Sequence, residues 1–435
     1  MTDVLTALMQ SLDERAAHRH RLDRYYAGES PLSYLSAESA KALSGIRQLS
    51  VNIPRLLVDS MAERLRITGF TGVDVWDDWL RNDLDQMASV AHREALIVGD
   101  SYVMVWGDAG GRPNVSVESA HQVAVHSDPG TRQITAAVKR WETSTTTEAV
   151  LYGPDEIVRL RAEQTGATTA GFKVVETLAN PLGVVPVVRL RNGDRLLGHG
   201  RSEMADVLDL SDAVNKLTLD LMTASEYTAR PRRFATGIEL TETDVLDDDG
   251  EPTGDTEAEN PFPESDRMMI AEPEGAKFGQ LPGADLGGYQ NAVNVLMRQI
   301  SAVSGLPEHM LGIGGDNPTS ADAMRAAEAS LTARAQARQA QFGRSWETVA
   351  RLMVAVRDGV DPQRVDARVV WADPSTRSEA QVADATTKLF QADLIPASTA
   401  LARLGYTDDE ITAIAAARRA DSLNNLAVDL GKLTS

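Results

Sequence analysis

The segment of this chain closest in type to a phosphate-binding loop is Gly312-Ile313-Gly314-Gly315-Asp316-Asn317. A dinucleotide-binding loop would need its third glycine where Asn317 stands, and it would follow a strand, whereas helical periodicity precedes this segment. No Gly-Lys-Ser/Thr sequence occurs anywhere, so a Walker-type nucleotide site is not expected. We therefore interpret the glycines as a loop that joins two helices.

The acidic run Asp247-Asp248-Asp249-Gly250 is the second candidate, because calcium-binding loops combine such acids with a glycine. With Gly250 at the loop glycine, Val245 falls at the first ligand position and Thr256 at the bidentate acid. Neither can serve, so no formed calcium site is expected, although weak divalent binding stays open. Residues 241–259 contain nine acids and no base, and we interpret them as a solvated loop.

Histidines are the remaining candidates for metal binding or proton transfer. His18 and His20 are two residues apart on a predicted helix and so face different directions, and His121 and His126 are five apart in a strand region. Neither pair has ligand spacing along the chain, and neither His-Glu-x-x-His nor Gly-x-Ser-x-Gly occurs. Scattered acids could still meet in space, but nothing selects a pair. The sequence predicts no catalytic residue, no cofactor and no metal site.

One basic cluster, Arg230-Pro231-Arg232-Arg233, lies at the end of a predicted long helix. Cations at a helix C-terminus interact favourably with the backbone dipole, so helix capping is one interpretation. A contact to phosphate or to a partner protein is the other, since three basic residues precede the acidic segment. Both interpretations remain open from sequence.

Composition excludes several classes of function. The 435 residues include 63 acids, 43 Lys and Arg and no cysteine, for a formal net charge of −20. Disulfide frameworks, thiolate nucleophiles and Cys-held zinc or iron–sulfur sites are therefore absent, and a globally basic grip on nucleic acid is not expected. The length suggests two or three structural units. Neither a membrane span nor a signal peptide is expected, which places synthesis in a cytoplasm.

Periodicity in the first 195 residues predicts helices first and then strands. The helices are expected over residues 3–27, 54–66 and 83–98. Short β-rich runs separated by Gly, Pro and Asp turns then predict an antiparallel meander. The expected strands are residues 102–106, 115–117, 123–125, 134–141, 149–152, 157–160, 172–176 and 185–190. The expected fold class is α+β.

The second half is dominated by long helices. Helices are predicted over 202–227, over 286–304 and from after Pro318 to about Arg357, the last with Thr319 and Asp322 as a capping box. So long a helix indicates coiled-coil or helix-array packing. Short strands are expected at 233–240, 268–271 and 369–371, and helices near 378–390, 396–404 and 408–430.

Several blocks of this sequence resemble the portal proteins of tailed double-stranded-DNA bacteriophages, specifically the siphophage-type family. The matching blocks are Tyr25-Tyr26-Ala27-Gly28-Glu29-Ser30-Pro31-Leu32, residues 51–60, Gly99-Asp100-Ser101-Tyr102-Val103-Met104-Val105-Trp106, Gly200-Arg201-Ser202-Glu203, Ala276-Lys277-Phe278-Gly279-Gln280 and residues 314–320. They spread over about residues 20–360.

The resemblance implies a portal fold and an assembly function. It implies a wing (1–200), stem helices (201–228 and 282–305) around a small β-containing clip (229–281), a tunnel loop (306–318), a long wing helix and strand (319–375) and a helical crown (376–435). Such proteins form rings, usually of twelve copies, at one capsid vertex. They are not enzymes and use no cofactor. Implied partners are the terminase large subunit, head-completion or adaptor proteins, major capsid and scaffolding proteins, and DNA that passes through without sequence-specific binding.

The resemblance also assigns roles to residues. It implies a tunnel loop near DNA with Glu308, His309, Gly312, Gly314, Gly315, Asp316 and Asn317. It implies clip contacts to partners by Arg230, Arg232, Arg233, Asp247, Asp248 and Asp249. It implies stem packing between subunits, which fits the apolar stripes Val207, Leu210, Val214, Leu217 and Leu221 and Val293, Met297 and Ile300.

The acidity fits a conduit in which DNA must slide, because a basic lining would retain phosphate at every step. Many proteins are acidic for solubility alone, so composition does not separate the two readings. Two alternatives stay open: another virion component, such as a head-completion adaptor or minor capsid protein, and a soluble acidic hydrolase, which would need convergent carboxylates with perturbed pKa values.

Overall fold

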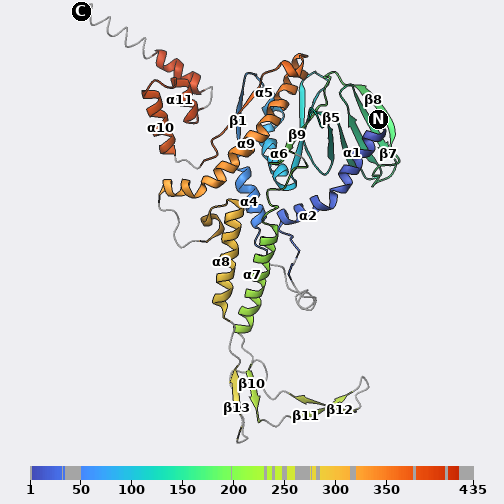
Figure 1. The fold of residues 1–435 in the computed structure, drawn as a ribbon, viewed down its shortest axis with the longest axis vertical. Coiled ribbons are helices and arrows are strands. Elements are labelled where there is room, and N and C mark those ends of the chain that lie inside the picture. Colours follow the sequence, from blue (N-terminus) through green and yellow to red (C-terminus); the bar gives the residue numbers. More distant parts are fainter. Residues whose placement is uncertain are drawn as a thin grey trace, which may run out of the picture. The chain divides into compact units, whose positions relative to one another are not determined.

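The chain folds into two compact units. The computed structural model describes residues 2–31, 33–34, 50–196, 198–229, 233–237, 241–246, 252–259, 275, 277–280, 285–313, 320–375, 379–406 and 410–420. Unit 1 comprises Met1–Glu29, Asn52–Leu208 and Ile300–Ser435, and unit 2 comprises Ser30–Val51 and Asp209–Gln299 (Figure 1). Helices and strands are mixed along the chain, which confirms the α+β class.

A five-stranded antiparallel meander forms one core of unit 1. Its strands follow each other in chain order, as predicted, but the predicted strands 102–106, 115–117 and 185–190 are not part of it and form a separate sheet. The helix α1 (Thr2–Glu14) lays Leu8, Met9 and Leu12 on this sheet against small and aliphatic side chains. The strands are β4 (Val123–Ser127), β5 (Ile134–Glu142), β6 (Thr147–Tyr152), β7 (Glu156–Ala162) and β8 (Lys173–Ala179).

The first predicted helix is two helices, so the expectation of one helix over 3–27 is wrong. The chain breaks at Arg15, and α2 (Ala16–Ala27) continues in a new direction to Gly28, which ends it in a left-handed conformation with φ of +81°. The two helices pack on different elements: α1 packs on β4 and β5, whereas α2 packs on α4 and α6. One straight helix would not reach both surfaces.

A three-stranded sheet of order β3-β2-β9 forms the centre of unit 1, separate from the meander. Its middle strand β2 (Asp100–Gly107) is antiparallel to both β3 (Pro113–Ser119) and β9 (Val187–Arg191). The first six residues of β2 are buried, and they include the polar Asp100 and Ser101 as well as the apolar run from Tyr102 to Val105. Packed around this sheet are α6 (Leu84–Val98) and α9 (Ala321–Asp358).

The helix α9 has the predicted length of 38 residues but not the predicted packing. It packs on β2, β9, β3 and the later strand β14, so it is not a strand of a coiled coil. We call α9 the spine helix. The predicted capping box at Thr319 is also wrong, because Ser320 is the N-cap and its hydroxyl accepts from the Ala323 amide. The apolar stripe that suggested helix packing is buried mainly by strands, and its aromatic members Phe342 and Trp346 also contact His92 of α6.

A buried aromatic cluster joins α6 to α9. His92, with no exposed surface, stacks on Phe342 at 5.3 Å between ring centroids and meets Trp346 edge-on. Trp346 Nε1 donates to His92 Nε2 at 2.7 Å, so this ring nitrogen carries no proton. Burial lowers the pKa of His92 to about 3. This histidine is therefore a neutral core residue.

Several shorter elements complete unit 1, and β1 and α5 among them have no counterpart in the sequence prediction. β1 pairs antiparallel with β14, so two segments from opposite ends of the chain share a sheet. These elements are α4 (Ile53–Ala62), β1 (Ile67–Thr71), α5 (Trp76–Arg81), the 3-10 turn η2 (Pro362–Arg364), β14 (Arg368–Trp371), α10 (Glu379–Gln391) and α11 (Ala397–Arg403). Helical residues 410–420 follow, and the rest of the predicted helix 408–430 lies outside the described residues.

Unit 2 contains most of two helices and two strand pairs. The helices are α7 (Leu208–Ala229) and α8 (Leu286–Ser304), the second with the predicted bounds. β10 (Arg233–Thr236) pairs with β13 (Lys277–Gln280). The prediction of a solvated loop over 241–259 is wrong, because β11 (Thr241–Leu246) pairs with β12 (Pro252–Glu259). Cross-strand pairing overrides the low strand propensity of acids there. The predicted strand 268–271 lies outside the described residues.

Candidate functional site

Two of the sequence blocks that carry the portal resemblance meet in unit 1. A side chain on Gly200 would place its Cβ 1.8 Å from the Gly99 carbonyl oxygen, so the two backbones touch as only glycines allow. Gly99 also has φ of +96° and ends α6. We call the contact of Gly99 and Asp100 with residues 189–203 the clasp.

The carboxylate of Asp100, the acid of the clasp, is surrounded by hydrogen-bond donors. Its side chain is 1% exposed and receives two bonds from Arg189, at 2.8 and 2.9 Å. The Gly200 amide donates to Asp100 Oδ2 at 3.2 Å, and Arg15 approaches the same oxygen at 3.5 Å. A buried carboxylate held this way anchors three chain segments.

The second half of the clasp is also held by hydrogen bonds and ion pairs. Asn192 donates its amide hydrogens to the Arg201 carbonyl at 2.8 Å and to Glu203 at 3.1 Å. Arg338 of α9 donates to Glu203 at 3.0 Å and to Asp194 at 2.7 Å, and the bonds from Arg338 lower the pKa of Asp194. The clasp thus ties the spine helix to the end of the central sheet.

Two grooves in the described part of unit 1 offer little for hydrolysis. One, of about 830 Å³, is lined by valines of 184–188 and by Arg189, Arg344 and Arg351, with Asp128 at its rim. Backbone and side-chain hydrogen bonds from Thr131 lower the pKa of Asp128. The other, of about 560 Å³, contains the acids that Arg338 neutralises. A general acid needs a raised pKa, so the lowered pKa values of Asp128 and Asp194 suit anchoring rather than proton donation.

The end of α8 is fastened to the spine helix. Gly305 terminates α8 in a left-handed conformation with φ of +75°, and a Cβ there would lie 2.8 Å from Ser330 Oγ. Arg334 donates to the Val303 carbonyl at 2.8 Å, and Ser301 donates to the Leu306 carbonyl at 2.7 Å. The last carbonyls of α8 therefore have partners, and the following segment begins from a fixed point.

The expected tunnel loop is described only in its first part. Residues 308–311 form the 3-10 turn η1, which Gly312 ends with φ of +69°. Glu308 is exposed, whereas His309 Nε2 lies 3.8 Å from Oε1 of the buried Glu328. His309 is therefore directed at α9 within its own chain. Gly314, Gly315, Asp316 and Asn317 lie outside the described residues.

The expected clip contacts lie mostly outside the described residues too. This holds for Arg230, Arg232, Asp247, Asp248 and Asp249. Arg233 is the first residue of β10, opposite Gln280 of β13. The choice between helix capping and partner contact thus stays open for this cluster.

The expected stem stripes are mostly covered within the single chain. Val207, Val214 and Ile300 have no exposed surface, so nothing remains for a neighbouring subunit to cover. The other five are half-buried: Leu210, Leu217, Leu221, Val293 and Met297.

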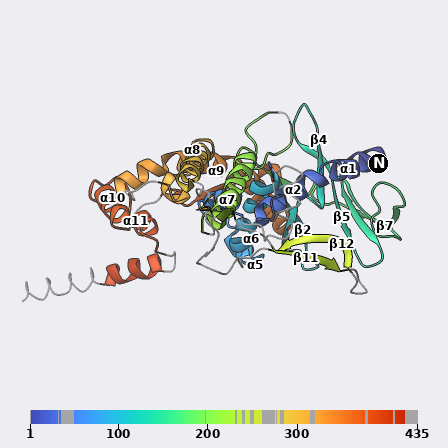
Figure 2. The same cartoon turned by 90° about the horizontal axis from the view of Figure 1, so that it is seen from below.

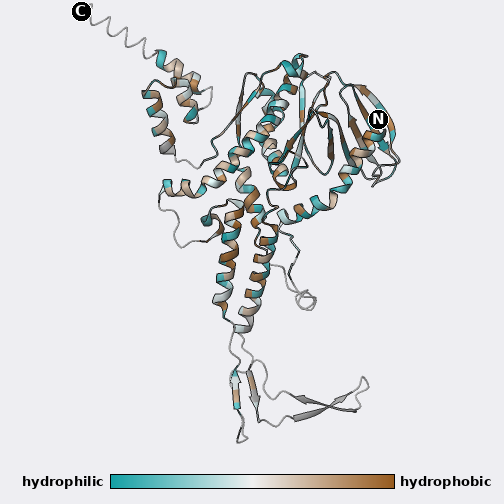
Figure 3. Ribbon diagram, viewed as in Figure 1, coloured by the Kyte–Doolittle hydropathy of each residue, from teal (hydrophilic) through white to brown (hydrophobic). Residues whose placement is uncertain are grey.

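The exposed apolar surface of α7 and α8 lies at other positions, which the stripe analysis missed. Met222 is 58% exposed and Val295 is 54% exposed. The two helices lie alongside each other in both views, and apolar residues extend along each of them (Figures 1, 2 and 3). Apolar residues off the main stripe were the available sequence signal for a second contact surface.

The start of α7 is tied to the segment that precedes it in unit 2. Asn215 Oδ1 accepts from the Val51 amide at 2.8 Å, and Ser33 donates to Asp212 at 2.8 Å. These contacts explain why Ser30–Val51 belongs to the same unit as α7 although 1–200 was expected to be wing. Among the described helices, none combines the length and apolarity that crossing a bilayer requires.

Comparison with known proteins identifies relatives over almost the whole chain. The family model for phage portal proteins, SPP1 Gp6-like, matches residues 7–422. The portal protein of Mycobacterium phage D29 is 32% identical over 383 residues, covering 82% of this chain and 76% of that protein. The portal protein of Mycobacterium phage L5 is 30% identical over 414 residues, covering 88% and 82%.

Among solved structures, the neck of an empty GTA particle, computed with C6 symmetry, superposes with a TM-score of 0.49. It is 14% identical and covers 89% of this chain and 93% of that chain. The family assignment rests on the sequence comparisons, which include the clasp and both long helices of unit 2. This chain belongs to the SPP1 Gp6-like family of phage portal proteins.

Proposed function

We propose that this chain is the subunit of a closed ring, a dodecamer by family analogy, at one vertex of a phage capsid. The ring is the channel for DNA during packaging and ejection, and it docks the terminase large subunit and then the head-completion proteins. The chain has no catalysis of its own in this proposal, and ATP hydrolysis belongs to the terminase. The observation that carries the proposal is the family match over residues 7–422.

The division of the chain supports a stem and clip in unit 2. Residues 209–299, together with Ser30–Val51, separate from the rest as one compact unit, and the first of these ranges agrees with the proposed stem helices 201–228 and 282–305 around a clip at 229–281. The wing then corresponds to residues 1–200 with 319–375, the tunnel loop to 306–318, and the crown to 376–435. Terminase and adaptor docking on the clip is part of the same proposal.

Exposed apolar side chains support association between copies. Met222 and Val295 are more than half exposed on helices that already have their stripes covered. In a closed ring each subunit contacts two neighbours through different surfaces, so such residues become buried without leaving an open end. Burial of these residues between neighbouring stems is the physical part of the proposal.

The negative charge is consistent with a channel that does not hold DNA. A net charge of −20 per chain opposes retention of phosphate, so DNA slides instead of binding. Assembly in the host cytoplasm with major capsid and scaffolding proteins, followed by residence in the virion, completes the proposal.

Native mass measurement combined with negative-stain imaging of the purified full chain tests the proposal. The expected particle has a mass near twelve times 46.9 kDa and a central opening. The second arm is co-expression with the capsid and scaffolding proteins of the same phage. An assembling capsid vertex can nucleate a ring that the isolated chain does not form. Absence of ring-shaped particles in both arms would reject the proposal.

A further inference from the structure

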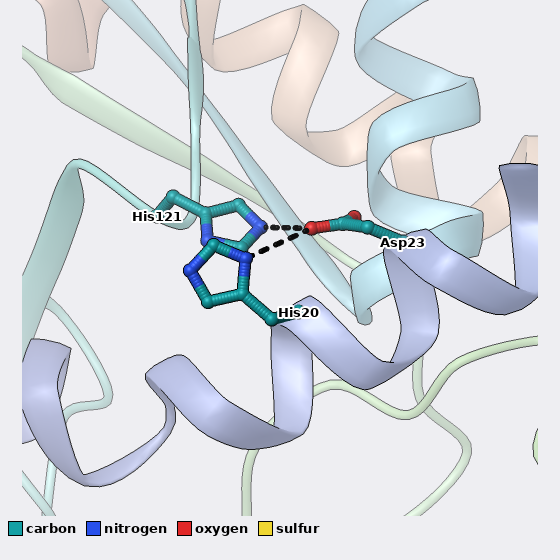
Figure 4. Close-up of side chains that lie close together, drawn as sticks. All are labelled: His20, Asp23 and His121. Atoms are coloured by element: carbon teal, nitrogen blue, oxygen red, sulfur yellow. Dashed lines mark ion pairs between the residues drawn. The ribbon is translucent and has the colours of Figure 1, made fainter. Parts of the chain in front are cut away.

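Three side chains with metal-binding atoms converge in unit 1, away from the clasp. His20 and Asp23 lie one turn apart on α2, and His121 lies in the turn between β3 and β4 (Figure 4). One ligand atom from each lies within 4.8 Å of the other two. Neither histidine pair has ligand spacing along the chain, whereas the fold brings one member of each pair together.

The distances suit one small ion. His121 Nε2 lies 2.9 Å from Asp23 Oδ2, and His20 Nδ1 lies 3.9 Å from the same oxygen. Tetrahedral zinc, with bonds of about 2.0–2.1 Å, places its ligand atoms about 3.3 Å apart, between these two values. His20 is 74% exposed on its side chain, so its ring is free to make the small adjustment.

The contact of His121 with Asp23 is close without being a well-formed hydrogen bond. His121 Nε2 is buried and, by bond angles, has no hydrogen-bond partner in the described structure, although Asp23 Oδ2 is 2.9 Å away. The two groups are therefore close together without a hydrogen bond between them. Two ligands of a shared ion have this arrangement, because each points at the ion.

The arginines that flank these residues on α2 are engaged elsewhere. Arg19 donates to the Leu12 carbonyl at 3.4 Å, Arg24 donates to the Glu29 carbonyl at 3.2 Å, and Arg21 lies over the ring of Tyr25. Repulsion of a divalent cation by these charges is weakened where the guanidinium groups are turned away from the ligand atoms.

We propose that His20, Asp23 and His121 bind one Zn²⁺ ion, with solvent in the fourth position. Two imidazole nitrogens and a carboxylate favour Zn²⁺, Co²⁺, Ni²⁺ or Cu²⁺ over Mg²⁺ and Ca²⁺, which prefer oxygen ligands. The ion fastens α2 to the turn at which the chain passes from the three-stranded sheet to the meander. The site is independent of the proposed ring function.

Calorimetric titration of the tag-free full chain with ZnCl₂ tests the site, with the Co²⁺ absorption spectrum as a report of ligand number. We expect one ion per chain, a rise in the unfolding temperature with Zn²⁺, and no competition from a large excess of Mg²⁺ or Ca²⁺. His20→Ala, His121→Ala and Asp23→Asn each weaken Zn²⁺ binding at least tenfold. His18→Ala on the same helix and His126→Ala are the matched controls and bind as the wild type does.

Two results would overturn the proposal: no saturable Zn²⁺ binding by the wild type, or undiminished binding by His20→Ala and Asp23→Asn. These variants decide the matter even if His121→Ala does not fold, because His20 is exposed and Asn has the shape of Asp. Equal losses in His18→Ala would show binding at another site and would also reject it. Circular dichroism without metal establishes that each variant is folded.

Discussion

The clasp and the two long helices of unit 2 differ in how far the single chain buries and pairs their side chains. At the clasp, Asp100 and Glu203 are buried, and arginines of the same chain neutralise both. On α7 and α8, Met222 and Val295 are apolar and more than half exposed. The clasp is complete in one chain, whereas these helices leave apolar surface that a neighbouring copy can cover.

This difference indicates which changes should act on folding and which on assembly. A substitution in the clasp either leaves a buried charge without its partner or pushes a new side chain against the backbone. Both effects destabilise the single chain, before any association between copies. A surface change on α7 or α8 removes nothing that the single chain needs.

Gly200→Ala should destabilise the chain most, by at least about 3 kcal/mol, since the new Cβ meets the Gly99 carbonyl and a backbone must move. Urea-induced unfolding followed by fluorescence measures the loss. Gly69→Ala is the control, because a Cβ at Gly69 meets nothing within 4 Å. Equal stability of the two variants would show that the clasp backbones are not in contact.

Asp100→Asn should cost about 3 kcal/mol, because it leaves Arg189 charged in a half-buried site without its carboxylate. The same unfolding measurement applies. Asp206→Asn is the control, since its partner Arg201 is 64% exposed and a surface pair contributes less than about 1 kcal/mol. A loss as small as that of the control would contradict the anchoring role of Asp100.

His92 should make unfolding depend on pH below neutrality. Its folded pKa of about 3 lies below the unfolded value of 6.5, so the unfolded state gains a proton first as the pH falls. Stability is therefore full above pH 6.5 and decreases below it, by about 2 kcal/mol at pH 5 from this residue. Comparison of urea midpoints at pH 7 and pH 5 tests this.

The matched variant for that prediction is His92→Gln, which has no titrating group at this position. It should be less stable than the wild type at pH 7, because it disrupts the stack on Phe342, yet its midpoint should change less between pH 7 and pH 5. An equal change in both proteins would assign the dependence to other residues.

Val295→Asp should have the smallest effect on the single chain, within about 0.5 kcal/mol, because Val295 is exposed. The same change should strongly reduce association, since a charge would be buried between subunits. Analytical ultracentrifugation measures the association, with Gln290→Glu on the same helix as a charge-matched control. Ring formation equal to that of wild type would remove Val295 from the interface.

The sequence predicted elements whose evidence is local. Periodicity located α8 from Leu286 to Ser304 and the 38 residues of α9, because hydrophobic spacing along a helix is readable from neighbouring positions. It could not show what covers those helices, so α9 was expected to pack on helices and instead packs on sheets. It also missed β11 and β12, since their pairing and not their composition makes them strands.

The candidate site was less predictable, because its contacts join distant parts of the chain. Asp100 and the Gly200 amide are separated by 100 residues, and the clasp blocks showed only as family-like motifs without a structural reason. His20 and His121 likewise meet only through the fold. Of the expected tunnel-loop residues, Glu308, His309 and Gly312 are described, and His309 is directed at Glu328.

The central claim is that the exposed apolar surface of α7 and α8 becomes buried between copies. The chain has no cysteine, so Val295→Cys places a single thiol on that surface. The rate of maleimide labelling is measured in the monomer and in the assembled ring, with the denatured chain as the reference for full reactivity. We predict rapid labelling in the monomer and at least tenfold slower labelling in the ring. Equal rates in monomer and ring would contradict the claim.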